Sequence, residues 1–147
     1  MRGAILVLVC ALLAGCGGGG SKRLSKEEYA RRADAVCTLY QRLTAAFGTP
    51  STPSGLARVA DRTLHALDKA IADLRRLHPP ESEQQLAGRW LASLSTLRRD
   101  VVRLRDRARA NDLAGIQRIV GPAQRHDRAS AQLAATLGMV VCSKEAG

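Results

Sequence analysis

The chain has 147 residues, a net charge of +10 and only 3% aromatic residues. This length is sufficient for one domain with a hydrophobic core. The arginines alternate with acidic residues at helical spacing, and the sequence has neither an aromatic platform for base stacking nor a recognisable nucleic-acid module. We therefore expect no nucleic-acid partner.

Residues 1–15 have the layout of a signal peptide. Arg2 provides a positive charge near the start, and residues 4–13 form an apolar run without any charge. That run is too short for a membrane-spanning helix, which needs about 20 apolar residues. It has the length of the hydrophobic part of a signal peptide, so we expect residues 1–15 to be removed.

The next feature is the tetrapeptide Leu13-Ala14-Gly15-Cys16. It resembles the lipobox of bacterial prolipoproteins. The resemblance implies cleavage before Cys16, attachment of lipid to its thiol, and anchoring at the extracytoplasmic face of the cell membrane. Residues 16–24 are then the lipidated cysteine and a flexible, glycine-rich tether. The alternative is an ordinary secretory signal in which Cys16 has no special role.

The first helix is predicted to begin at a capping box. Ser25 is followed three residues later by Glu28, a spacing that lets each side chain satisfy a free backbone N–H at a helix start. Gly48 is expected to end this helix. Apolar residues recur between them at steps of three and four, which predicts one buried face: Tyr29, Ala33, Val36, Cys37, Tyr40, Leu43 and Phe47.

Two more amphipathic helices follow. Pro79 and Pro80 end the second, because proline disfavours helical backbone in the residue before it, and the third is expected to begin near Ser82. Trp90 is interpreted as a core anchor of the third helix rather than a ligand platform. The predicted buried residues are Leu56, Ala60, Leu64, Leu67, Ile71 and Leu74 in the second helix, and Leu86, Trp90, Leu94, Leu97, Val101, Leu104 and Ala108 in the third.

Asn111 and Asp112 predict a left-handed helix end followed at once by a new N-cap. The fourth helix should continue to Gly138, with a kink or a break at Pro122. Its predicted buried residues are Leu113, Ile116, Ile119, Val120, Ala123, Leu133 and Leu137.

His126 and Ser130 have two interpretations. If the apolar face continues straight through Pro122, both side chains point to the core and would line a small cavity. If the helix rotates after the kink, both face water, and this is the interpretation that we favour. The first interpretation would suit a carrier of small ligands.

No segment of any length has the two-residue period of a strand. Four amphipathic helices with short connections predict an all-α protein, an up-down-up-down four-helix bundle with a kinked fourth helix and a C-terminal tail. The domain organisation is then residues 1–15, the signal peptide; residues 16–24, the lipidated cysteine and tether; and residues 25–147, the helical bundle.

The cysteines indicate an oxidising compartment. Cys10 would leave with the signal peptide and Cys16 would carry lipid, so Cys37 and Cys142 remain. Two remaining cysteines in an exported domain usually pair. We predict a disulfide that holds the tail against the middle of the first helix. The alternative is two buried free thiols.

Residues 98–128 are the most basic region, with nine arginines and four aspartates. One interpretation is a solvated helix surface without a ligand. The other is an anion-binding face that would contact anionic envelope polymer or lipid. Its candidate residues are Arg98, Arg99, Arg103, Arg105 and Arg109.

Nothing in the sequence predicts an enzyme, a metal site or a cofactor. The three histidines, His65, His78 and His126, have no metal-ligand spacing on a common helix face. The motifs of metalloproteases, serine hydrolases and phosphate-binding loops are also missing.

Three segments of the mature part carry a further resemblance: Tyr29 with 33–37, Leu74 with 77–80, and 137–138 with Cys142. They are similar to segments of small exported helical lipoproteins of high-GC Gram-positive bacteria. The resemblance implies a fold and a disulfide but no catalytic residue. We therefore expect a membrane-anchored extracytoplasmic lipoprotein with a non-catalytic binding or structural module, whose partner is anionic polymer or another protein of the envelope. The alternative is a small-ligand carrier with a cavity inside the bundle.

Overall fold

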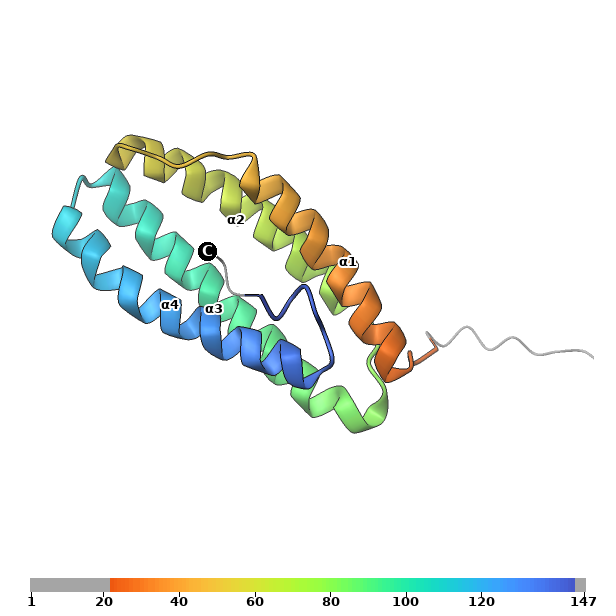
Figure 1. Cartoon of the computed structure of the whole chain (residues 1–147). Helices are drawn as coiled ribbons and strands as arrows, with labels where there is room; N and C mark the ends of the chain where they lie inside the picture. The colour runs from red at the N-terminus through yellow and green to blue at the C-terminus, as the bar shows by residue number, and fades with distance from the viewer. Residues whose placement is uncertain (1–21, 145–147) are drawn as a thin grey trace, which may run out of the picture.

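A computed structural model describes residues 22–144, which form an all-helical bundle without strands (Figure 1). The expected signal peptide, lipidation site and most of the tether lie outside the described residues. The elements are α1 (Lys26–Ala45), α2 (Pro53–Arg75), the short 3-10 helix η1 (Glu81–Glu83), α3 (Gln84–Arg109) and α4 (Leu113–Thr136). The all-α prediction is confirmed for this part of the chain. None of its helices has the length and apolar character needed to cross a membrane.

Side-chain caps explain where three of the helices begin. Ser25 Oγ accepts the backbone N–H of Glu28 at 3.1 Å, Thr52 Oγ1 accepts that of Gly55 at 3.1 Å, and Asp112 Oδ1 accepts that of Gly115 at 2.7 Å. Each cap satisfies a backbone donor that has no partner inside its helix.

One expectation about helix starts needs correction. The Glu28 carboxylate does not complete the capping box; it binds the guanidinium groups of Arg31 and Arg32 instead, because charged donors one turn away form stronger hydrogen bonds. The third helix begins at Gln84, close to the predicted Ser82, and η1 occupies the turn between it and the two prolines.

The predicted helix ends agree with the structure. Asn111 has a φ of 53° between α3 and α4, and Gly48 and Gly138 have φ values of 73° and 82°. These left-handed residues turn the chain out of the helix. α4 is continuous in secondary structure through Pro122, so it does not split there.

The best-buried part of the core lies at the end of the bundle where α1 and α3 begin and α2 and α4 end (Figure 1). Tyr29 and Trp90 are each 1% exposed, which confirms Trp90 as a core anchor. The other buried members of this cluster are Ala30, Ala33, Leu74, Ala87, Ala134, Leu137 and Met139.

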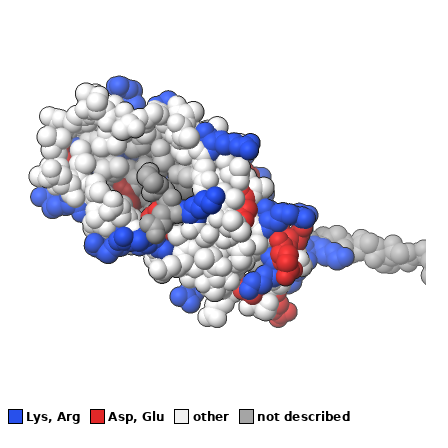
Figure 2. All heavy atoms as spheres, in the orientation of Figure 1, with Lys and Arg blue, Asp and Glu red and all other residues white. Residues whose placement is uncertain are grey.

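The opposite half of the bundle is more open than the apolar pattern predicts. Leu43 is 42% exposed, Leu113 59% and Val120 43%, although all three were expected to be buried. α1 packs mainly on α2, and α4 mainly on α3, so α1 and α4 cover little of each other. The space-filling view shows a hollow on this face (Figure 2).

The segment after α4 returns along α1. Met139 is buried in the core cluster, and Cys142 is joined to Cys37 by a disulfide with a Cα–Cα distance of 5.4 Å. Cys37 lies in the middle of α1, so the predicted pairing and the placement of the tail are both confirmed. Val140, between these anchors, is 66% exposed.

Candidate functional site

Three of the five candidate anion-binding arginines pair with aspartates of α2. Arg98 Nη2 lies 3.0 Å from Asp68 Oδ2, and Arg109 Nη2 lies 2.7 Å from Asp61 Oδ2. Arg105 lies 3.7 Å from the same Asp61 carboxylate. The two aspartates belong to α2, so this side of α3 is used for pairing between helices.

Pairing with an arginine changes the pKa of the aspartate. The hydrogen bond from Arg98 lowers the pKa of Asp68 below its ordinary value of 3.8, with a further contribution from the charge of Arg98. The carboxylate therefore stays ionised further into the acidic range, and its charge offsets that of Arg98. Sequence analysis missed Asp61 and Asp68, because their relation to α3 depends on how two helices are rotated against each other.

The other two candidate arginines do not extend this surface into one basic face. Arg99 donates to Thr96 Oγ1 at 2.8 Å, and Arg103 binds Asp100 at the junction with α4. Figure 2 shows basic side chains scattered over the visible face rather than gathered in one patch. The structure therefore does not bring the five predicted arginines together around a common ligand position.

A surface depression of about 400 Å³ lies at the turn between α3 and α4. It is lined by Arg103, Asp106, Arg107, Ala110, Gly115, Arg118 and Ile119. Only Arg103 is among the five predicted residues. Arg107 and Arg118 belong to the same basic region of the sequence, and the signal that could have identified them is their position on either side of a tight turn.

The N-cap of α4 shapes one wall of this depression. Asp112 accepts the Gly115 N–H and also binds Arg107, with 3.1 Å between Nη1 and Oδ2. The Gly115 hydrogen bond, followed by the charges of Arg107 and Arg118, lowers the pKa of Asp112. A Cβ at position 115 would collide with the Asp112 carboxylate and the Arg107 side chain. Glycine thus allows Asp112 and Arg107 to lie across the first turn of α4.

His126 and Ser130 are both held against α3. Ser93 Oγ donates to Ser130 Oγ at 2.9 Å, and Ser130 is only 4% exposed. His126 Nδ1 lies 2.7 Å from Oδ2 of Asp100, which is 2% exposed. The favoured interpretation, that both residues face water, is therefore wrong for Ser130. Neither residue lines the depression at the α3–α4 turn.

Within residues 22–144, no group of three or more histidine, cysteine or acidic side chains is arranged to hold a metal ion. Cys16, the expected lipidation site, lies outside the described residues. No protein-family model, curated protein or solved structure matches the chain.

Proposed function

We propose that the chain is a lipoprotein anchored at the extracytoplasmic face of a bacterial cell membrane, with a helical domain that acts as a non-catalytic binding or structural module of the envelope. The Cys37–Cys142 disulfide carries this proposal, because structural disulfides persist in oxidising compartments and are rare in the cytosol. The resemblance of residues 13–16 to a lipobox supplies the anchor.

The arrangement of the domain suits a tether at its N-terminal end. The described chain begins at Lys22, beside the well-packed end of the bundle, while the α3–α4 turn lies at the opposite end (Figure 1). The backbone N–H of Leu24 donates to His78 O at 2.9 Å, and Lys26 pairs with Glu83 at 2.9 Å. These contacts join the start of the domain to the α2–α3 connection, beside the best-buried part of the core.

For the domain itself we propose an up-down-up-down order of the four helices, with a kink at Pro122. The order is supported by the packing of α1 on α2, α2 on α3 and α3 on α4. The kink is expected because Pro122 lacks the N–H that a helix interior requires and its ring crowds the preceding turn.

The alternative, a carrier of small ligands, would need an enclosed cavity in the bundle. Ser130 and Asp100 do not favour one beside His126, because their polar groups already bind Ser93 and His126. We therefore place binding on the surface of the domain.

Metabolic labelling with a fatty-acid probe, followed by membrane fractionation, tests the proposal. We expect the parent protein to be labelled and Cys16→Ala to lose the label, because only a thiol accepts the lipid. Cys10→Ala is the matched control and should remain labelled, since Cys10 precedes the cleavage position. Equal labelling of the Cys16→Ala protein and its parent would contradict the proposal.

A further inference from the structure

We propose that the depression at the α3–α4 turn is a binding site for a phosphate-bearing anion, held by Arg103, Arg107 and Arg118. The inference rests on the proposed function, in which the domain is a binding module, and it names the ligand class and the residues that take it.

Arginines predominate among the charged side chains that line this depression. Three guanidinium groups line it together with one carboxylate, that of Asp106. Asp106 is itself paired with Arg105, at 2.8 Å. Within residues 22–144, Arg118 makes no hydrogen bond and no ion pair within 4 Å, although its charge lowers the pKa of the nearby Asp112. An anion in the depression would therefore meet three guanidinium groups, of which two also bind Asp100 and Asp112 and one, that of Arg118, has no hydrogen-bond partner among the described residues.

The donor geometry suits a phosphate group. A guanidinium presents five N–H donors in a planar fork, which matches two oxygens of one phosphate. Arg107 uses Nη1 on Asp112, and Arg103 uses Nη2 on Asp100, so each retains further donors. Asp100 and Asp112 also fix the positions of these two arginines, which reduces the entropy lost when they bind a ligand.

The size of the depression limits the ligand. A volume of about 400 Å³ falls at the small end of typical ligand sites. It is sufficient for a phosphate ester or one phosphate unit of a longer molecule. The close approach of Asp112 and Arg107 to Gly115 leaves no room for a Cβ at this wall, so the shape of the depression depends on glycine at position 115.

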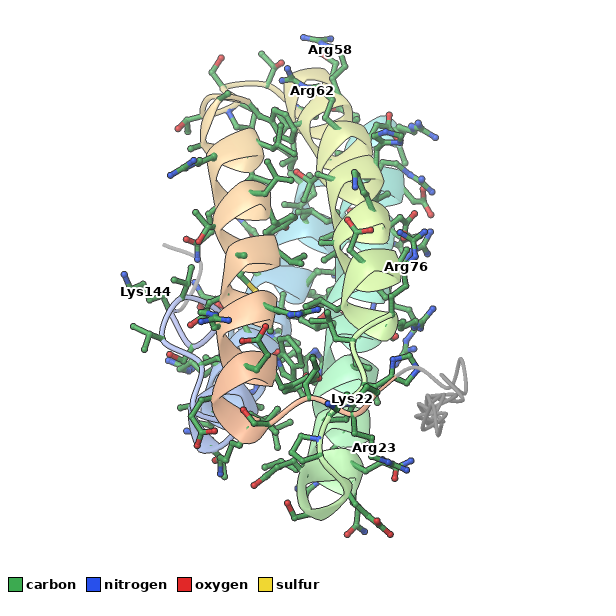
Figure 3. The ribbon with its side chains drawn as sticks, turned by 90° about the vertical axis from the view of Figure 1, so that its right-hand side faces the viewer. Lys22, Arg23, Arg58, Arg62, Arg76 and Lys144 are labelled. Carbon is green, nitrogen blue, oxygen red and sulfur yellow. A yellow bond between two sulfur atoms is a disulfide. The ribbon has the colours of Figure 1, made fainter. Side chains whose placement is uncertain are left out.

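The position of the depression favours a phosphate away from the anchoring membrane. Arg58 and Arg62, near the start of α2, lie at one end of the bundle, and Lys22 and Arg23 lie at the other (Figure 3). The α3–α4 turn shares the end of the bundle at which α2 begins (Figure 1). A protein tethered before Lys22 would present the depression outward.

The test is calorimetric titration of the mature protein, purified in detergent, with glycerol phosphate and pyrophosphate at low ionic strength. We expect Arg118→Ala to weaken binding about tenfold or more, because a hydrogen bond to a charged group contributes about 1.5–3 kcal/mol. Arg58→Ala is the matched control: it removes the same charge at the same end of the bundle but outside the depression, and it should leave affinity within about twofold. Both variants should keep the parental thermal midpoint.

A second experiment distinguishes the phosphate of a lipid headgroup from that of a soluble molecule. Sedimentation with vesicles of phosphatidylglycerol, compared with phosphatidylcholine, reports binding to a lipid headgroup. Binding that depends on Arg118 in either experiment supports the site and identifies its source.

The inference is overturned if the parent binds neither soluble phosphate nor vesicles. It is equally overturned if Arg58→Ala and Arg118→Ala weaken binding alike, or if chloride at the same ionic strength competes for the protein as well as phosphate does, since general charge attraction would then suffice. Fatty-acid labelling of Cys16 is unaffected by these outcomes, so failure of this site is distinguishable from failure of the proposed function.

Discussion

The carboxylate of Asp34 accepts the backbone N–H of Cys142, with 2.9 Å between Oδ1 and N, one helical turn before the cysteine to which Cys142 is bonded. The same carboxylate accepts the N–H groups of Val140 and Val141, each at 2.8 Å. α1 thus holds the tail through the covalent bond to Cys37 and through three backbone hydrogen bonds to Asp34, and Gln41 Nε2 also donates to Val141 O at 3.2 Å. The clamp satisfies the donors of a segment that has no regular secondary structure of its own.

Replacement of this carboxylate should loosen the tail. We expect Asp34→Ala to lower the free energy of unfolding by about 1.5–3 kcal/mol, the range for hydrogen bonds to a charged group. Asp73→Ala is the control; it removes only pairs within a turn of Lys69 and Arg76 and should cost about 0.5 kcal/mol or less. Urea unfolding monitored by circular dichroism measures both. Equal losses for the two variants would argue against the clamp.

Loss of the disulfide should destabilise the domain strongly. The bond closes a loop with a sequence separation of 105 residues, for which the chain-entropy relation gives about 4.7 kcal/mol, within the usual cost of about 2–5 kcal/mol for removal of a native disulfide. We expect Cys37→Ala and Cys142→Ala to lower the thermal midpoint equally. Peptide mapping of the non-reduced parent should yield a peptide pair joined through these residues. Two freely alkylatable thiols would refute the bond.

The hydroxyl of Tyr29 is a buried polar group without a hydrogen-bond partner among the described residues, and burial raises its pKa. We expect Tyr29→Phe to leave the free energy of unfolding unchanged or to raise it by about 1 kcal/mol, because no hydrogen bond is lost and less polar surface is buried. Tyr29→Ala should instead cost about 3 kcal/mol or more by leaving a cavity. A destabilised Tyr29→Phe protein in chemical denaturation would show that the hydroxyl has a partner in solution.

Two glycine substitutions should have opposite signs. Gly115→Ala introduces a Cβ against Asp112 and Arg107, so it should weaken the α4 cap and cost about 1 kcal/mol or more. Gly88 lies in α3 with open space around the position of a Cβ, so Gly88→Ala should stabilise by about 0.5–1 kcal/mol through helix propensity. Thermal unfolding of both proteins provides the measurement. A stabilising Gly115→Ala would contradict the described geometry.

The Asp68–Arg98 pair should contribute to the pH dependence of stability. Because the folded-state pKa of Asp68 is lowered from 3.8, its contribution is present above that value and is lost as the pH falls through the lowered pKa. We expect Asp68→Asn to be less stable than the parent at about pH 6 and the difference to vanish towards about pH 2. Denaturation series across this range measure the gap; a gap that is constant with pH would exclude the pair as its source.

Local chemistry made much of the fold predictable. Ser25 and Asp112 mark helix starts and Asn111 and Gly138 mark helix ends, because caps and left-handed residues act on backbone groups within a few positions along the chain. The Cys37–Cys142 pairing was also predictable, since few cysteines remained to be paired. The same pattern failed for Leu43 and Val120, because an apolar face indicates which side of a helix could be buried but not whether a neighbour covers it.

Only the tertiary structure decided which charged groups meet. Nothing in the sequence relates Asp61 to Arg109 or Asp68 to Arg98, and the partner of Asp34 is a backbone segment more than 100 residues away. Such contacts depend on the rotation and offset of one packed helix against another, which the total packing of the core determines. For this reason the sequence by itself determined the helices, their ends and the disulfide. Only folding divided the basic region into two groups of arginines, those paired with α2 and those that line the α3–α4 depression.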